Sequence, residues 1–231
     1  MNDTASSRWL GPAQLTALGF LALILTGTVL LTMPFSSADG TATAPMSALF
    51  TATSATTLTG LVTEDTGSHW SLAGQVIVLA LIQVGGLGIM SITSLTGMLL
   101  TGRVKLRSRY STAAEGRPIL EGGVRRTLVA TLLLTFFFEA VVAAILFIRF
   151  ATTYDMPLPR AAWEGVFHAI SAFNNAGFGL RSDSLISYNT DGWILIPLAG
   201  ALMIGGLGYP VLSELVRRAR ERVRGWLRGT P

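Results

Sequence analysis

The stretch Phe50-Thr-Ala-Thr-Ser-Ala-Thr-Thr-Leu-Thr-Gly60 aligns without gaps to Phe167-His-Ala-Ile-Ser-Ala-Phe-Asn-Asn-Ala-Gly177, at an offset of 117 residues. Further along, Gly85-Gly-Leu-Gly88 recurs as Gly205-Gly-Leu-Gly208 at an offset of 120. Two landmarks at nearly one offset are hard to obtain by chance, so the sequence predicts an internal duplication. We expect one copy in residues 1–110 and the second, followed by a basic tail, in residues 111–231.

Both copies lie in sequence that is typical of a membrane protein. Half of the 231 residues are hydrophobic and 13% are charged, whereas soluble domains carry about 25% charged residues. Four apolar stretches, at 13–33, 71–101, 127–148 and 193–212, reach the roughly 20 residues that a helix needs to cross a bilayer. The first is longer than the apolar core of a typical signal peptide. The sequence therefore predicts an all-α membrane protein with four transmembrane helices.

Between the paired spans lie two segments, residues 45–63 and 160–180, that resemble neither a loop nor a span. Each has helix-compatible residues followed by a short polar turn that contains glycine. A helix over residues 46–56 would be about 16 Å long at 1.5 Å per residue, which is about half of a 30 Å hydrocarbon core. Irregular backbone at membrane depth is tolerated where it is buried in protein or lines a water-filled cavity. We therefore expect two re-entrant pore helices, each followed by a filter loop.

The basic residues indicate the orientation in the membrane. Of the 17 basic residues, 14 precede the first span, separate the second from the third, or follow the fourth. The positive-inside rule places these segments in the cytoplasm. We expect a multi-pass protein of the cell membrane with cytoplasmic termini, whose arginines also contact anionic lipid. This distribution gives no reason to invoke a nucleic-acid partner.

The two copies have the same direction across the membrane, because an even number of spans separates them. They would be parallel repeats about an axis along the membrane normal, with their loops together at the centre. Carbonyl groups of such loops can replace the hydration shell of a monovalent cation, and the carboxyl end of each short helix favours positive charge. The alternative for each loop is an ordinary turn. The candidate ion-binding residues are Thr57, Leu58, Thr59 and Gly60 in the first loop, and Asn174, Asn175, Ala176 and Gly177 in the second.

The composition argues against an enzyme. The chain has no cysteine and two histidines, so thiolate and multi-histidine metal sites are excluded, and no nucleophile–base arrangement is visible. We expect no cofactor. A channel for water or a small neutral solute is a competing interpretation, but such folds usually have inverted repeats.

The filter segments resemble those of the Trk/Ktr/HKT potassium-transporter superfamily. Ser54-Ala-Thr-Thr-Leu-Thr-Gly-Leu-Val62 is similar to its first filter, and Ser171-Ala-Phe-Asn-Asn-Ala-Gly-Phe178 is similar to its second. The resemblance implies potassium uptake, with the filter glycines at Gly60 and Gly177. It also implies a cytosolic nucleotide-binding regulatory subunit on the basic inner face, and sodium or proton coupling that no residue here indicates.

The chain departs from that superfamily in having two repeats where its members have four. We therefore expect either a truncated chain or a pore that is completed by a homodimer or by a second half-chain. The function predicted is the pore-forming half of a potassium uptake transporter. The alternative is a non-conducting half-subunit that acts only through assembly with a partner chain.

Two charged residues near or within the spans also carry expectations. Glu139 lies in the middle of the third span, where a carboxylate is a functional candidate by default. The plainer expectation is a structural partner to a hydroxyl or backbone group of a neighbouring helix. Arg149 lies near the outer boundary and is expected to extend its charge to the interface.

Overall fold

The computed structural model describes residues 12–106, 120–207 and 211 of the chain. Its regular structure in these residues is helical, apart from an isolated bridge between Ser37 and Trp70. The labelled elements are α1 (Pro12–Thr32), η1 (Pro34–Ser36), α2 (Pro45–Thr57), α3 (Leu72–Leu106), α4 (Leu120–Thr153), α5 (Leu158–Phe173) and η2 (Ile186–Tyr188). A further apolar helix, Gly192–Leu207, follows η2.

The long apolar helices agree with the predicted spans. Within the described residues, three segments are long and apolar enough to cross a membrane: Gln14–Thr32, Leu72–Ile89 and Val129–Thr153. The fourth predicted span begins as the helix Gly192–Leu207, which is shorter, and most of its predicted end at 208–212 lies outside the described residues. The chain is thus an all-α membrane protein. The predicted boundary between residues 110 and 111, and the side chains of most predicted cytoplasmic arginines, also lie outside them.

The two short helices form where half-length pore helices were predicted. α2 has 13 residues and α5 has 16, so they are about 20 and 24 Å long. Each has a proline in its first turn, a position where the missing N–H leaves no helical hydrogen bond unmade. Both stop well short of the 30 Å needed to cross a hydrocarbon core.

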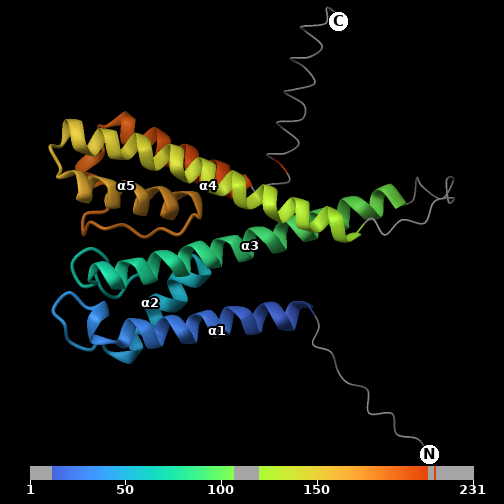
Figure 1. Cartoon of the computed structure of the whole chain (residues 1–231), viewed down its shortest axis with the longest axis horizontal. Coiled ribbons are helices and arrows are strands. Elements are labelled where there is room, and N and C mark those ends of the chain that lie inside the picture. Colours follow the sequence, from blue (N-terminus) through green and yellow to red (C-terminus); the bar gives the residue numbers. More distant parts are fainter. Residues whose placement is uncertain (1–11, 107–119, 208–210, 212–231) are drawn as a thin grey trace, which may run out of the picture.

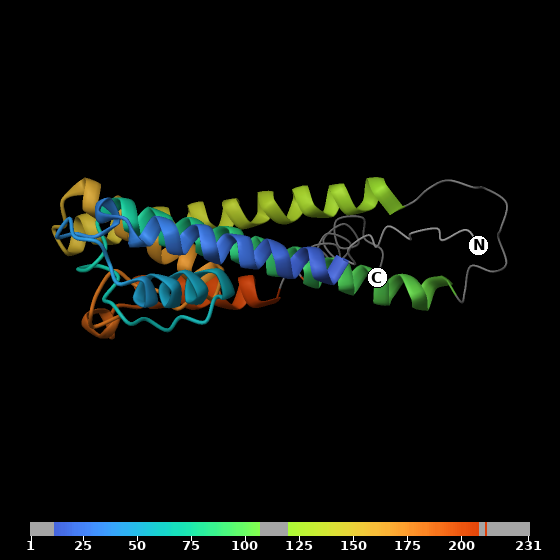
Figure 2. The same ribbon diagram turned by 90° about the horizontal axis from the view of Figure 1, so that it is seen from below.

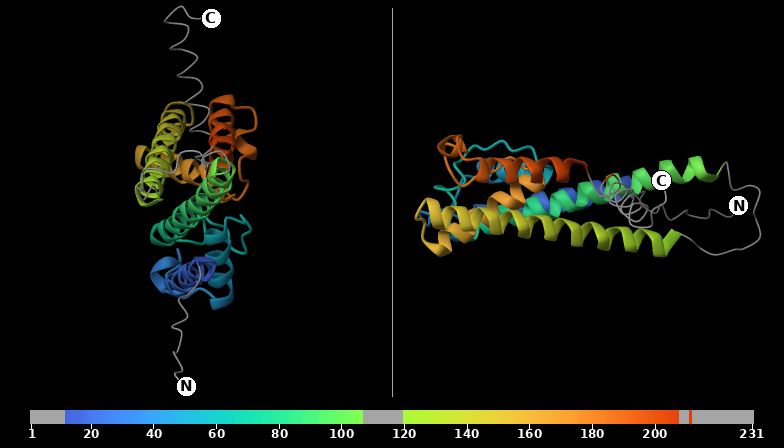
Figure 3. Two further views of the ribbon diagram at one scale, coloured as in Figure 1. Left: turned by 90° about the vertical axis from the view of Figure 1, so that its right-hand side faces the viewer. Right: turned by 90° about the horizontal axis from the view of Figure 1, so that it is seen from above.

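The helices pack as two groups joined through α3. The long helices α1, α3 and α4 have roughly parallel axes, with α3 running opposite to α1 and α4, and α2 and α5 lie beside one end of them (Figure 1). The first group is α1, α2 and α3, in which α1 and α2 pack together on one side of α3 and lie nearest the viewer in Figure 2. The second group is α4, α5 and the helix Gly192–Leu207, which lie on the other side of α3 (Figure 3).

Each group has its own apolar cluster. The first is formed by α1, α2 and α3 together with residues of the second group, namely Phe167, Ala176 and Phe178. The second cluster lies among α4, α5 and Gly192–Leu207, around Leu146 and Phe150. Because the first cluster includes side chains from both groups, the groups share a packed boundary.

At the end of α4, Arg149 does not simply extend to the interface as expected. Its Nε donates to Oδ2 of Asp191 at 2.7 Å, and the hydroxyl of Tyr154 donates to the same oxygen at 3.0 Å. The hydrogen bond from Arg149 is the main reason why the pKa of Asp191 lies below its usual value. Asp191 also begins the helix Gly192–Leu207, because its side chain accepts from the N–H of Trp193. The pair therefore ties α4 to the last described helix.

Candidate functional site

The first predicted loop leaves α2 through a left-handed residue. Leu58 has φ 58°, and Gly60 has φ 75°. The N–H of Thr59 donates to the carbonyl of Ser54 at 3.0 Å, and its hydroxyl contacts the Ser54 hydroxyl at 3.2 Å. The hydroxyls of Thr57 and Thr59 share a hydrogen bond of 3.3 Å. Hydroxyl groups therefore hold this loop against the end of its own helix.

The second predicted loop has the same backbone form. Asn175 has φ 57°, and Gly177 has φ 74°. The N–H of Ala176 donates to the carbonyl of Ser171 at 2.8 Å, at positions that match Thr59 and Ser54 of the first loop. The two left-handed residues and this hydrogen bond all recur at the offset of 117 that the sequence indicates. The loops are thus alike in conformation as well as in sequence.

The structure brings the two loops together at their glycines. A Cβ atom added to Gly60 would lie 2.8 Å from the carbonyl oxygen of Ala176 and 3.1 Å from Cα of Gly177. A Cβ added to Gly177 would lie 3.1 Å from Cα of Gly60. No side chain fits there without displacing the opposite loop, and the positive φ values independently favour glycine. The eight predicted residues therefore lie at the end of α2 and in the two loops that follow α2 and α5, and the loops contact one another at their glycines.

The Gly-Gly-Leu-Gly runs lie directly behind the ends of the short helices. A Cβ added to Gly85 would overlap the carbonyl oxygen of Thr56, at the end of α2. A Cβ added to Gly205 would overlap the carbonyl oxygen of Phe173, at the end of α5. These glycines let the long helices approach the backbone from which each loop begins, as small residues do between membrane helices.

One polar network at this site was not predicted as a whole. Glu139 of α4 is buried, and its two carboxylate oxygens accept from the side-chain amides of Gln83 and Asn174. The expected hydroxyl or backbone partner was wrong: the partners of Glu139 are the side-chain amides of Gln83 and Asn174. The sequence signal for this network was an acidic residue within an apolar span, and that signal does not predict which residues form its hydrogen bonds.

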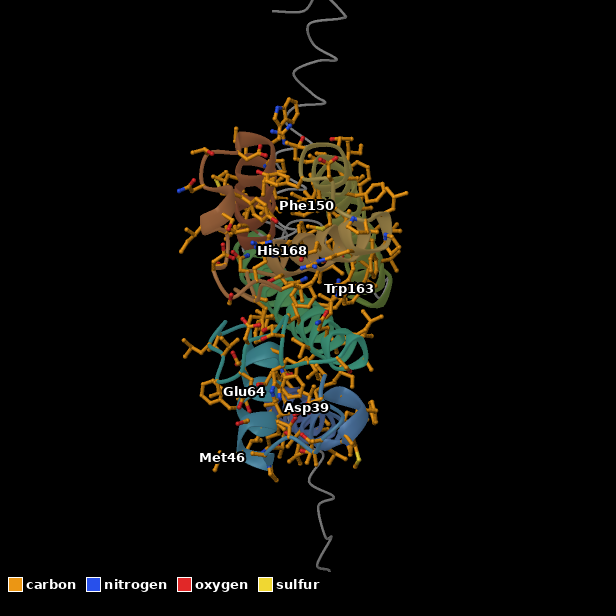
Figure 4. The ribbon with its side chains drawn as sticks, turned by 90° about the vertical axis from the view of Figure 1, so that its left-hand side faces the viewer. Asp39, Met46, Glu64, Phe150, Trp163 and His168 are labelled. Carbon is orange, nitrogen blue, oxygen red and sulfur yellow. The ribbon has the colours of Figure 1, made fainter. Side chains whose placement is uncertain are left out.

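Another buried polar pair lies in α5. Nδ1 of His168 donates to the carbonyl of Glu164 at 2.8 Å, and Nε2 of His168 has no hydrogen-bond partner within the described residues. His168 lines an open pocket of about 450 Å³, together with Asn175 and Gly177 of the second loop. In Figure 4, His168 and Trp163 of α5 lie on the same side as Phe150 of α4, whereas Asp39, Met46 and Glu64 lie on the other side, with α1 and α2. Within the described residues, no group of three or more acidic or histidine side chains could hold a metal ion.

Several characterised proteins have similar sequences. The chain is 38% identical over 213 residues to the Ktr system potassium uptake protein B of Bacillus subtilis, covering 90% of this chain and 46% of that protein. It is 36% identical to the protein of the same name from Vibrio alginolyticus, covering 91% of this chain and 46% of that one. It is also 36% identical to the potassium/sodium uptake protein NtpJ of Enterococcus hirae, covering 92% of this chain and 47% of that protein.

The chain spans about half the length of these relatives. Comparison with known families matches residues 12–226 to TrkH, described as a cation transport protein. The match includes every described helix and both glycine-containing loops. This chain therefore belongs to the TrkH family of cation transport proteins.

Proposed function

We propose that this chain is the pore-forming half of a potassium uptake transporter, and that the carbonyl groups of residues 57–60 and 174–177 bind the ion. The observation that carries the proposal is the contact between the two loops at Gly60 and Gly177. Two loops of equal conformation, each at the carboxyl end of a short helix, present their backbones to one another. The similar proteins are named as potassium uptake proteins, and one of them as a potassium/sodium uptake protein.

The chemistry of the loops suits a weakly hydrated monovalent cation. The segments 57–60 and 174–177 contain no acidic side chain, so carbonyl oxygens and the helix ends supply the negative potential. Left-handed residues alternate with other conformations in both loops, which changes the direction of successive peptide groups. A divalent ion would be expected to need carboxylates as ligands.

We infer that the two groups of helices are parallel helix–pore loop–helix repeats. Three features support this: the shared offset, the equal backbone of the loops, and the matching contacts of Gly85 and Gly205 behind them. Two such repeats around one axis contribute half of the four that the superfamily resemblance implies. A complete pore then takes two further repeats.

The pocket beside the second loop supports that inference. Leu195, Leu198 and Leu202 line it, and at the offset of 120 they correspond to Gln75, Val78 and Ile82 of α3. In the first group of helices, residues of the second group cover these three positions. Val78 and Ile82 belong to the apolar cluster that includes Phe167 of α5, and Gln75 accepts a hydrogen bond from Trp163 of α5. The pocket is therefore the surface onto which a third repeat would pack.

The second candidate function is a half-subunit that does not conduct by itself. It is favoured by the open pocket at the second loop, which no residue of a third repeat covers in the described part of the chain. A cytosolic nucleotide-binding regulatory subunit, and coupling to sodium or protons, are further proposals that rest on the resemblance alone.

The test is rubidium uptake into proteoliposomes that contain only the purified chain. Gly60→Ser and Gly177→Ser each place a side chain against the opposite loop. We expect each substitution to abolish the part of the rubidium uptake that added potassium inhibits by competition. Gly40→Ser is the matched control, because Gly40 has φ 72° but nothing lies within 4 Å of an added Cβ. Uptake that survives in both loop variants would refute the carbonyl pathway. No uptake by folded wild-type protein would leave the non-conducting half-subunit.

A further inference from the structure

The buried carboxylate of Glu139 lies next to the residue that begins the second loop. Glu139 is 5% exposed and belongs to the apolar segment Val129–Thr153 of α4. Its Oε1 accepts from Nδ2 of Asn174 at 3.1 Å, and its Oε2 accepts from Nε2 of Gln83 at 3.3 Å. Each oxygen thus has its own donor, and the network connects α3, α4 and the loop.

Asn174 is held from several sides. Its Nδ2 also lies within hydrogen-bond distance of Oε1 of Gln83, at 3.2 Å, and of the carbonyl of Ile170, at 2.9 Å. On the far side, a Cβ added to Gly86 of α3 would lie 2.7 Å from Cγ of Asn174. The Asn174 side chain therefore fills the space between Glu139 and the backbone of α3.

Both carboxyl oxygens of Glu139 serve as acceptors in this arrangement. A buried amide that loses its acceptor is costly. The carbonyl of Asn174 begins the run of residues 174–177, so a shift of the Asn174 side chain moves the first group of that run. By contrast, the neighbouring hydrogen bond from Trp163 to Gln75, at 2.7 Å, joins the same two groups of helices without contacting either loop.

We infer that Glu139 is a positioning residue for the second filter loop, and that through Asn174 it sets the affinity and selectivity of the site for the cation. This inference rests on the proposed function. Gln83 lies in α3, in the first group of helices, and contacts both Glu139 and Asn174 of the second group. The packing of the two groups is thereby linked to the geometry of the loop.

The principal variant is Glu139→Gln, which keeps the side-chain volume but replaces one acceptor oxygen with a donor. One of the two amides then faces another amide donor. We expect the KM for rubidium to rise about tenfold, the equivalent of one lost buried hydrogen bond, and sodium to compete more effectively. The exchange variant Gln83→Glu with Glu139→Gln returns a carboxylate to the network, and we expect it to recover most of the affinity.

The matched control is Gln75→Met, which removes the hydrogen bond from Trp163 and those that Gln75 donates to the carbonyls of Trp70 and Gly67, and leaves the contacts of both filter loops intact. A purely structural role for Glu139 predicts equal changes in KM for Glu139→Gln and Gln75→Met. Equal changes, or an exchange variant with no recovery, would overturn the inference. A raised KM that is confined to Glu139→Gln and reversed by the exchange would support it.

A second measurement separates this inference from the proposed function. Because the chain has no cysteine, a single Asn175→Cys substitution reports on the second loop without background. We expect Glu139→Gln to raise the rate at which a methanethiosulfonate reagent modifies this cysteine, and Gln75→Met to leave the rate unchanged. If the wild-type chain conducts no rubidium, the proposed function fails for the isolated chain, and this rate alone decides the inference. An unchanged rate in Glu139→Gln would then overturn it.

Discussion

The first glycine of the Gly-Gly-Leu-Gly run in α3 should be far less tolerant of alanine than the last. A Cβ at Gly85 would overlap the carbonyl oxygen of Thr56, with the carbonyl carbon 2.9 Å away. A Cβ at Gly88 would meet only the ring of Phe20, at 3.4 Å. Both positions lie within α3, Leu72–Leu106, so both gain the same helix propensity from alanine. The comparison isolates the packing against the end of α2.

The size of the effect follows from these contacts. Carbon atoms pack best at about 3.5–4.0 Å, so Gly85→Ala must displace the end of α2 by about 1 Å. Overpacking of this kind costs about 1–3 kcal/mol, against a gain of about 1 kcal/mol when alanine replaces glycine in a helix. Gly88→Ala keeps most of that gain. We expect the two variants to differ by about 2 kcal/mol, or about 4–8 °C in Tm for a chain of this length.

The assay is thermal unfolding of both purified variants in one detergent, followed by loss of the monodisperse peak in size-exclusion chromatography. Because the displaced carbonyl belongs to the residue before the first loop, rubidium uptake should also fall in Gly85→Ala and persist in Gly88→Ala. Equal Tm values for the two variants would refute the close approach of α3 to α2. A lower Tm for Gly88→Ala than for Gly85→Ala would refute it as well.

Three further predictions concern the second group of helices. Gly205→Ala should lower the Tm relative to Gly200→Ala, since a Cβ at Gly205 would overlap a carbonyl oxygen of α5 whereas nothing lies within 4 Å of one at Gly200. Asp191→Asn should destabilise the protein by about 1 kcal/mol at neutral pH through weaker charge-assisted hydrogen bonds. Because folding lowers the pKa of Asp191, its stabilisation is complete above the unfolded pKa of about 4 and is lost as the pH falls below that value, so Tm values measured from pH 7 to pH 3 should converge. Trp163→Phe should lower the Tm by removing the donor to Gln75, while the KM for rubidium in proteoliposome uptake stays unchanged.

Local sequence was sufficient to predict the short helices and their loops. The predicted helix at 46–56 corresponds to α2, Pro45–Thr57, and the segment from residue 160 includes most of α5, Leu158–Phe173. Proline at the start and a glycine-containing turn at the end act within a few residues, so they are visible in the sequence. The duplication added the register, because it indicated that the backbone of one loop should recur in the other.

The partners of buried polar groups could not be predicted in this way. Gln83 and Glu139 are 56 residues apart, and Gln83 and Asn174 are 91 apart. Their contact depends on how α3 and α4 pack, and a single sequence carries no local signal for that. The partner of Arg149 was not predicted for the same reason: Asp191 lies 42 residues away, and an arginine at an interface has many ways to satisfy its charge.

The repeated loops share a backbone and one capping contact, but the second loop has further partners. Thr57 occupies the position of Asn174 at the offset of 117, and each donates to the carbonyl four residues earlier in its own helix. Asn174 also contacts Glu139 and Gln83, which reach it from other helices, whereas Thr57 shares its other hydrogen bond with the Thr59 hydroxyl. The side-chain hydrogen bonds of the first loop therefore stay within α2 and the loop itself, whereas those of the second extend to α3 and α4. A movement of α3 against α4 would act directly on the Asn174 side chain, so coupling between helix packing and the proposed ion binding should be sought there.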